Sequence, residues 1–197
     1  MKKIEIIWRE LLFQVIEKNN RKFTQRDLAD YFGFSTSTVF QALKPARQMG
    51  AARVGGRNFV LEDPEKLLYH WASVRNLSTD IIFQGRVDMT VSEIEGLIPP
   101  GAAYAAYSAA KKFVKEPPAD YSKVYFYADN LEEIKKRYRL VGRGEPNLFV
   151  LQPDRFLTNY GQTTTLAQTF VDLWNLQDWY AKEFTEALKD KIDELLP

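Results

Sequence analysis

Few side chains in this sequence are suited to covalent or metal chemistry. The 197 residues include one histidine, His70, and no cysteine, which leaves neither a thiolate zinc site nor a disulfide framework. No GxSxG elbow is present, so a hydrolase triad is not indicated. We expect His70 to be a structural residue beside Trp71, and we expect the protein to use no metal and no cofactor.

Asp129 is the best candidate for an acidic catalytic residue. It directly follows the strand-like segment VYFYA, where nucleotidyltransferases place metal-binding aspartates. No Asp-x-Asp pair accompanies it, and a single carboxylate holds Mg²⁺ weakly. The simpler interpretation is that Asp129 caps a helix beginning at Asn130. The stretch GRGEPN lacks the lysine and hydroxyl of a phosphate-binding loop. We therefore expect no enzyme; the alternative is a nucleotide-binding or nucleotidyltransferase-like enzyme.

Hydroxyl and amide side chains form a more informative pattern, within the segment FTQRDLADYFGFSTSTVFQAL. Thr24 is a suitable N-cap for a short helix that runs through about Phe32. Gly33 supplies the left-handed residue that ends this helix. Ser35 or Thr36 is expected to cap a second helix, which runs towards residue 50.

These features match a helix-turn-helix, preceded by a helix from about Ile4 to Lys18. The close approach of two steeply crossing helices needs a small residue, and Ala29 stands four residues before Gly33. Apolar side chains occupy the expected inner face: Leu28, Phe32, Phe34, Val39 and Ala42. This conjunction favours a DNA-binding helix-turn-helix over two packed helices of an ordinary core.

The second helix would present a polar face for reading bases. With Val39, Ala42 and Leu43 turned inward, the outer face carries Thr36, Ser37, Phe40, Gln41 and Lys44. Gln41 can pair with adenine in the major groove, and Lys44 and Arg47 lie where phosphates pass. Phe40 either contacts a thymine methyl or is tucked against the next element. Pro45 is expected to kink the helix or end it near Leu43.

A hairpin is predicted directly after this helix. In AARVGGRNFVLED, the strands Ala51–Val54 and Asn58–Leu61 flank a Gly55-Gly56 turn. Arg53 and Arg57 lie near the tip, from which a wing contacts phosphates or the minor groove. The alternative is a plain hairpin with solubilising arginines.

The distribution of charge supports a nucleic-acid-binding N-terminal part. The whole chain has a formal net charge of +1, but residues 1–62 hold 11 Lys/Arg against 6 Asp/Glu, and the remainder holds 16 against 20. Such asymmetry is typical of a DNA-binding segment joined to a part with another role. We predict a winged helix-turn-helix domain at residues 1–62, a connecting helix at 63–78 and an α+β C-terminal domain at 79–197.

The C-terminal part alternates strand-like and helical segments. Strands are predicted for DIIFQGRVDM, SKVYFYA and NLFVLQP, and helices for VSEIEGLI, AAYAAYSAAKKFV and NLEEIKKRYRL. Two further helices, separated near Gln177-Asp178, follow Thr163. The pattern predicts a small α+β domain with about three to five strands. Trp174, Trp179 and Tyr180 are expected either in a dimer contact or in the core.

No membrane or targeting segment is indicated. The start MKKIEIIWRELL places charges among its apolar residues, and no run of about 18 uncharged apolar residues occurs. We expect a cytoplasmic protein with no membrane partner.

The order of these motifs resembles the AbiEi-type proteins, the transcriptional-regulator antitoxins of type IV toxin–antitoxin systems. The resemblance covers most of the chain and rests on the helix-turn-helix with its hairpin, followed by GAAYAAYSAAKKF, PPADYSKVYFYAD and TTTLAQTFVDLWNL. It implies a head that binds operator DNA and represses its own operon. It also implies a C-terminal domain with a degenerate, non-enzymatic nucleotidyltransferase fold. Carried over, the family pattern implies contacts to bases or phosphates from Thr36, Ser37, Gln41 and Lys44, with Arg53 and Arg57 in the wing.

Together, these observations predict a sequence-specific DNA-binding transcriptional regulator, an autorepressing antitoxin-like protein whose partner is double-stranded DNA. A homodimer would read half-sites about 10 bp apart, or a multiple of that spacing. Besides the enzyme, the remaining alternative is a winged helix that serves as a protein-interaction module.

Overall fold

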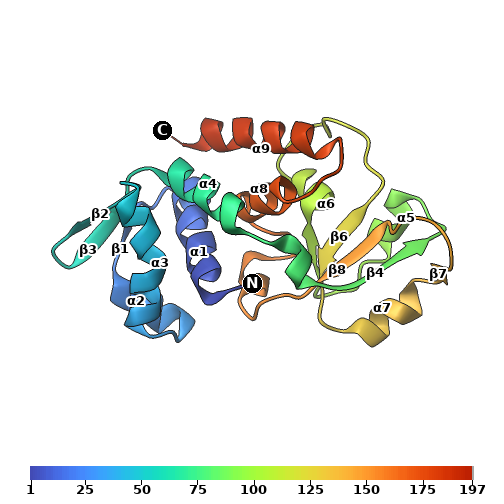
Figure 1. Cartoon of the computed structure of the whole chain (residues 1–197), viewed down its shortest axis with the longest axis horizontal. Coiled ribbons are helices and arrows are strands. Elements are labelled where there is room, and N and C mark those ends of the chain that lie inside the picture. Colours follow the sequence, from blue (N-terminus) through green and yellow to red (C-terminus); the bar gives the residue numbers. More distant parts are fainter. Residues whose placement is uncertain (197) are drawn as a thin grey trace. The chain divides into compact units, whose positions relative to one another are not determined.

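The computed structural model describes residues 1–196 and confirms the α+β class, with nine α-helices and two β-sheets in that part of the chain (Figure 1). The chain divides into two compact units, which we describe separately. The N-terminal unit comprises Met1–Arg75 and the residues from Ile192 onward, and the C-terminal unit comprises Asn76–Lys191.

The N-terminal unit combines four helices with a small antiparallel sheet. Its elements are α1 (Lys3–Lys18), β1 (Lys22–Phe23), α2 (Gln25–Phe32), α3 (Thr36–Gln48), β2 (Ala52–Gly55), β3 (Asn58–Leu61) and α4 (Pro64–Val74). The strand order is β1-β3-β2, and hairpin β2–β3 projects beyond the helices (Figure 1). Strand β1 was not expected, because two residues are too few to show an alternating pattern.

Helix α4 packs within the N-terminal unit. The sequence-based expectation was a helix that connects two domains. In the structure, Leu67, Leu68 and Trp71 are each 0 % exposed, and the whole helix falls inside Met1–Arg75. Asp63 caps it by accepting a hydrogen bond from the backbone N–H of Lys66 at 3.0 Å.

Helices α2 and α3 begin and end at residues suited to capping. Thr24 Oγ1 accepts a hydrogen bond from the backbone N–H of Asp27 at 3.0 Å, and Ser35 Oγ accepts one from Thr38 at 3.2 Å. Gly33 has a φ of +60° between the two helices, a conformation that costs an L side chain energy and costs glycine little. Of the two expected caps for α3, Ser35 is the one used.

The inner face of α3 is fixed against α1. Val39, Ala42 and Leu43 are each 0 % exposed, and the Trp8 indole Nε1 of α1 donates a hydrogen bond of 2.7 Å to the carbonyl oxygen of Ala42. Since this face is locked by packing and by a buried hydrogen bond, the opposite face of α3 is held towards solvent.

Pro45 was expected either to kink α3 or to end it near Leu43, and the second of these outcomes is not seen. The helix continues through Pro45 to Gln48. Pro45 has no N–H to donate to the carbonyl of Gln41, which lies on an exposed part of the helix where water can replace the lost bond. Ala46, in the next turn, is 0 % exposed, and this packing supports the continuation.

The hairpin turn lies one residue later than predicted. Gly55 pairs with Asn58 as the last residue of β2, so the two-residue turn is Gly56-Arg57. Gly56 has a φ of +55°, whereas Arg57 is not among the residues with positive φ. The change moves Arg57 from the flank of the tip into the tip itself.

The C-terminal unit contains a five-stranded mixed sheet, as many strands as the upper end of the prediction. Its elements are β4 (Ile81–Val87), α5 (Val91–Gly96), β5 (Ala103–Ala105), α6 (Ala106–Ala110), β6 (Val124–Tyr127), α7 (Leu131–Arg137), β7 (Leu140–Val141), β8 (Leu148–Leu151), α8 (Leu166–Trp174) and most of α9 (Ala181–Leu195), with short 3₁₀ turns at Leu77–Asp80 and Leu157–Tyr160. The last residues of α9, from Ile192, are counted with the N-terminal unit. The strand order is β5-β6-β8-β4-β7, and only β6 and β8 run parallel.

Helices cover both faces of this sheet. On one face, Phe126 and Val150 belong to a core with Ile94 of α5 and Ile134 of α7. On the other face, α6 packs against β6 and α8, and Tyr127 Oη donates a hydrogen bond to the carboxylate of Asp172 on α8 at 2.7 Å. Burial on both faces explains why VYFY and LFVL are apolar throughout rather than alternating.

The alanine-rich segment AAYAAYSAAKKFV is not the single helix that was predicted. Its first residues form β5, which pairs with β6, and only Ala106–Ala110 is helical. Ala106 has a φ of +46°, which is uncommon for any residue other than glycine. Since Ala105 and Ala106 are both 0 % exposed, packing overrides the helix propensity of alanine here.

The predicted cap of α7 is off by one residue. The side chain of Asn130, not that of Asp129, accepts the hydrogen bond from the backbone N–H of Glu133, at 3.2 Å. Asp129 is exposed.

The three tail aromatics have different environments. Trp174 and Trp179 are 49 % and 76 % exposed, whereas Tyr180 is buried. The core interpretation therefore holds for Tyr180 and not for the two tryptophans.

One edge of the second sheet is the two-residue strand β7. Its Leu140 packs directly over Gly85 of β4, where an added Cβ would lie 2.5 Å from Leu140 Cδ2. Leu140 and Val141 are nevertheless 45 % and 38 % exposed.

Candidate nucleic-acid interface

All eight side chains predicted to contact DNA are exposed. Six lie on α3, namely Thr36, Ser37, Phe40, Gln41, Lys44 and Arg47; Arg53 lies on β2 and Arg57 in the hairpin turn. Since α3 and β2 are consecutive and in contact, the structure gathers these residues on one helix and the hairpin beside it.

The hydroxyl groups at the start of α3 are not equivalent. Ser35 Oγ lies 2.9 Å from Ser37 Oγ and 2.9 Å from Thr38 Oγ1, in addition to its capping bond. The Ser37 hydroxyl is therefore partly committed to the cap, whereas the Thr36 hydroxyl makes no hydrogen bond within residues 1–196. The backbone N–H groups of this first turn and the helix dipole also favour a phosphate near this end.

Gln41 and Lys44 continue the same exposed face along the next turn. Neither side chain has a hydrogen bond or an ion pair in the part of the chain that the structure describes. An uncommitted amide can form two hydrogen bonds to adenine N6 and N7, and an uncommitted ammonium can approach a phosphate without breaking an ion pair.

Phe40 takes the exposed one of its two predicted positions. It is 42 % exposed, and the guanidinium carbon of Arg47 lies 5.7 Å from its ring centroid. This cation–π contact holds Arg47 over the aromatic face rather than leaving it extended.

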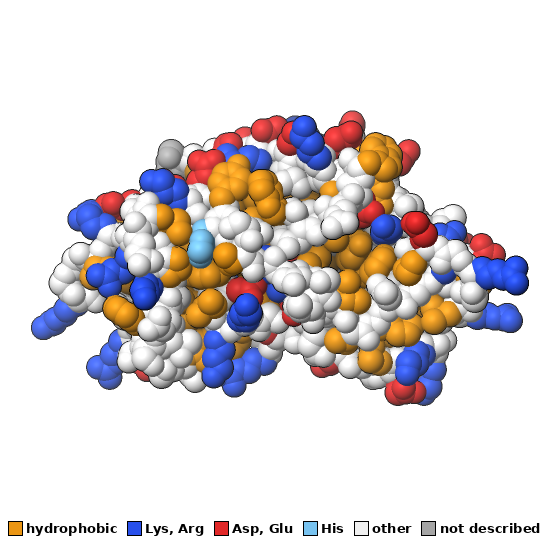
Figure 2. Space-filling model, viewed as in Figure 1, with side chains coloured by type: hydrophobic (Ala, Val, Ile, Leu, Met, Phe, Trp, Pro, Cys, Tyr) orange, Lys and Arg blue, Asp and Glu red, His pale blue; other side chains and the backbone are white. Residues whose placement is uncertain are grey.

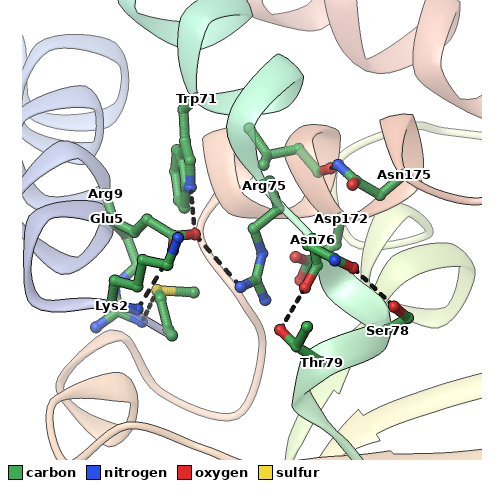
Figure 3. A network of polar contacts seen from close by, with 12 residues as sticks. Lys2, Glu5, Arg9, Trp71, Arg75, Asn76, Ser78, Thr79, Asp172 and Asn175 are labelled. Carbon is green, nitrogen blue, oxygen red and sulfur yellow. Dashed lines mark hydrogen bonds and ion pairs between the residues drawn. The ribbon is translucent and has the colours of Figure 1, made fainter. Parts of the chain in front are cut away.

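A buried ion pair reinforces the packing of α1 against α4 in the N-terminal unit (Figure 3). The Glu5 and Arg75 side chains are 6 % and 2 % exposed, and Arg75 Nη1 lies 3.3 Å from Glu5 Oε2. The same carboxylate oxygen accepts a hydrogen bond from Trp71 Nε1 at 3.1 Å. Helices α1 and α4 are joined in this way, while Trp8 joins α1 to α3.

His70 takes part in this packing. Its ring meets Trp8 edge-on at a centroid distance of 5.1 Å. Burial lowers the pKa of His70 below its usual value of 6.5, so the ring is neutral at pH 7.

The two hairpin arginines differ in how free they are to meet DNA. Arg53 Nε lies 2.5 Å from Glu62 Oε1, in an ion pair whose side chains are 68 % and 43 % exposed. Arg57 stands at the tip with no ion pair among residues 1–196. Arg57 is thus more available to an anion than Arg53, because Arg53 would first have to leave Glu62.

One cation near α3 was missed by sequence reasoning. Lys3 Nζ lies 5.3 Å from the ring centroid of Phe34, which belongs to the turn just before α3 and stacks on Phe32 at 5.4 Å. Only the tertiary packing of α1 brings Lys3 to the start of α3, so no local sequence signal identifies it. In Figure 2, Lys and Arg side chains are spread over the visible face of the N-terminal unit around the hairpin and the helices, with few Asp and Glu side chains among them.

The C-terminal unit has its own cavity, of about 350 Å³, beyond the carboxyl ends of β6 and β8. Asp129 follows β6, and Asp154, Arg155 and Thr158 follow β8; all four line it. The ends of adjacent parallel strands are a common place for ligands in α/β sheets. Within residues 1–196, however, no group of three or more His, Asp or Glu side chains is placed to hold a metal ion.

None of the helices in residues 1–196 combines the length and the apolar character needed to cross a bilayer.

Comparison of the chain with protein-family models, with curated proteins and with solved structures gave no match.

Proposed function

We propose that the N-terminal unit is a winged helix-turn-helix that binds double-stranded DNA, and that the protein is a non-enzymatic, sequence-specific transcriptional regulator. The observation that carries this proposal is that α3 has one buried apolar face and one exposed polar face. Val39, Ala42 and Leu43 are fully buried on one face. On the other face, the Thr36 and Gln41 side chains are exposed and form no hydrogen bond with any of residues 1–196.

In this proposal α3 enters the major groove and the β2–β3 hairpin meets the adjacent backbone. Gln41 reads adenine, and Thr36 contacts a base edge or a phosphate at the helix start. Lys44, Arg47 and Arg57 neutralise phosphates, joined by Lys3 beside the turn. Regulation then follows from steric exclusion of other proteins from the bound DNA.

The antitoxin-like part of the proposal rests on the order of motifs in the sequence. An autorepressor of this kind would bind upstream of its own gene, and a homodimer would place two copies of α3 on half-sites about one helical turn, 10 bp, apart. The exposed Trp174 and Trp179 are available for such a contact.

The test is DNA binding by the purified full chain, measured across a salt series with duplex from upstream of its own gene and with random duplex. We expect the logarithm of the binding constant to fall with a slope of about 0.9 per neutralised phosphate, and the specific site to bind at least about a thousandfold tighter than random DNA. Equal affinity for both duplexes would remove the claim of sequence specificity.

Three substitutions separate the roles of the named residues. Gln41→Ala should reduce discrimination between sequences by about 1–3 kcal/mol while leaving the salt slope unchanged. Lys44→Ala and Arg57→Ala should each lower the slope by about one phosphate for all sequences. Lys136→Ala, at an exposed position of α7 in the C-terminal unit, is the matched control and should change neither quantity.

A second candidate function, nucleotide binding, is favoured only by the cavity at the ends of β6 and β8. It predicts that ATP with Mg²⁺ binds the protein and that Asp129→Ala abolishes this binding. Calorimetry that detects no binding at millimolar nucleotide would end this candidate without affecting the first.

A further inference from the structure

The N-terminal unit holds a cavity that the proposed DNA contacts do not use. Its volume is about 380 Å³, and it lies between the second half of α1, strand β1 and helix α2. None of its lining residues belongs to α3 or to the β2–β3 hairpin. A cavity of this size falls within the range of about 300–1,000 Å³ that small-molecule sites occupy.

The walls of this cavity combine aromatic rings with carboxylates. Phe23 and Tyr31 supply the rings, and Glu10 and Asp27 supply the carboxylates. Glu10 is only 7 % exposed, and its Oε1 accepts a hydrogen bond of 2.8 Å from Gln14 Nε2, which also lines the cavity. Glu10 also takes part in a further interaction. A carboxylate held in a fixed orientation in this way can form a charge-assisted hydrogen bond with a cation that enters the cavity.

The charge balance selects the kind of ligand. Two carboxylates and one ammonium, that of Lys22, line the cavity, so an anion would meet net repulsion. Aromatic faces add attraction for an organic cation, and Tyr31, at 53 % exposed, leaves its ring accessible. We propose that this cavity binds a small molecule that carries an ammonium group on an apolar body.

Two sources share this chemistry, simple amines and α-amino acids. An α-amino acid carries a carboxylate that the corresponding amine lacks, and Lys22 could form an ion pair with this carboxylate. Lys22 is exposed and has no ion pair within residues 1–196. The two sources can therefore be told apart with pairs of compounds that differ only in that carboxylate.

A ligand here would act on the helix that supports α3. Thr24, Asp27, Leu28 and Tyr31 all belong to α2 or its cap, and α2 packs on α3 across the Gly33 turn. Filling the cavity favours the arrangement of α2 that the ligand binds best, and this couples the site to α3. This step, unlike the binding itself, rests on the proposed function.

The experiment is isothermal titration of the full chain, without DNA, with phenethylamine against phenylalanine and with isoamylamine against leucine. At least one amine should bind with a Kd of about 1 mM or tighter. Binding of the amine alone assigns an amine site, and equal binding of its amino acid assigns an amino-acid site. No heat from any of the four compounds at about ten times that concentration would overturn the proposal.

Variants keep the result specific to the cavity. Glu10→Gln should weaken binding at least about tenfold, since it keeps the shape and removes the charge. Tyr31→Ala, at an exposed position, should weaken binding as well and guards against a folding defect in the first variant. Lys44→Ala on α3 should leave binding unchanged. Binding that survives both cavity variants would place the ligand elsewhere and overturn the proposal. Because these titrations contain no DNA, their failure is distinguishable from failure of DNA binding.

Discussion

The buried pair Glu5–Arg75 offers a sharp test of how the N-terminal unit is held together. Removing one partner of a buried ion pair typically costs about 3–5 kcal/mol, because the other charge stays out of water. Here we expect the low end, about 3 kcal/mol for Glu5→Gln, since Arg75 has further interactions and the glutamine amide oxygen can still accept from Trp71. Arg75→Met should cost a similar amount.

The double variant carries the decisive information. If the two side chains interact as in Figure 3, the loss in Glu5→Gln/Arg75→Met should be smaller than the sum of the single losses by about 1–3 kcal/mol. The assay is urea unfolding followed by tryptophan fluorescence, because Trp8 and Trp71 both lie in this unit and are buried. The midpoint should fall while the slope stays constant.

An exposed pair in the same unit provides the control. Arg26 Nε and Asp30 Oδ2 lie 3.6 Å apart on α2, with side chains that are 86 % and 73 % exposed. Asp30→Asn should change the free energy of unfolding by no more than about 0.5 kcal/mol. The reasoning fails if Glu5→Gln costs as little as this control, or if the single losses in the Glu5 and Arg75 cycle simply add.

Three further predictions concern backbone strain, helix capping and protonation. Ala106→Gly should lower the free energy of unfolding by about 1–2 kcal/mol less than Ala105→Gly does. Both variants remove a buried methyl group, but only Ala106→Gly relieves a left-handed backbone conformation. Thermal unfolding measures the difference. Ser35→Ala should lower stability by about 1 kcal/mol through loss of the α3 cap, whereas Ser37→Ala should not; chemical denaturation separates them, and equal effects would count against the cap. For His70, whose folded-state pKa is lowered by burial, the unfolded chain takes up the proton first, so stability should fall as the pH drops below about 6.5. The pH profile of wild type minus His70→Gln isolates this contribution, and a flat difference would refute it.

Sequence reasoning worked best where local chemistry decides the conformation. The cap Thr24 and the left-handed Gly33 were identified, and the cap of α3 was narrowed to Ser35 or Thr36, because one side chain or one missing Cβ determines each feature. The apolar faces of the helices were identified for a similar reason, since a period of 3.6 residues is visible in the sequence itself.

Sequence reasoning failed where tertiary packing decides. Ala103 and Ala105 have a high helix propensity, yet burial and pairing with β6 place both of them in strand β5. Pro45 was expected to kink α3 or to end it near Leu43, and the helix continues to Gln48 because the buried Ala46 holds the next turn in place. The short strand β1 and the position of Lys3 beside Phe34 depend on partners far away in the sequence.

The sequence could predict which residues belong to the candidate interface, but not which of their side chains are already engaged in ion pairs or hydrogen bonds. Residue types and spacing identified α3 and the hairpin arginines. Only the three-dimensional structure distinguishes Arg53, which is paired with Glu62, from Arg57, which has no ion pair in the described part of the chain. Only the structure shows that the Ser37 hydroxyl lies within hydrogen-bonding distance of Ser35. Such differences depend on side-chain conformation, which no periodicity encodes.

The shortness of β7 has a consequence for how molecules of this protein meet at high concentration. An unpaired strand edge invites another chain to add to it by backbone hydrogen bonds. The outermost strand contains only Leu140 and Val141. A strand from another molecule could therefore form backbone hydrogen bonds along two residues only, which is too few for stable pairing. Leu140 and Val141 are partly exposed to water, but the edge on which they lie is too short for the sheet to grow into a fibre by adding strands.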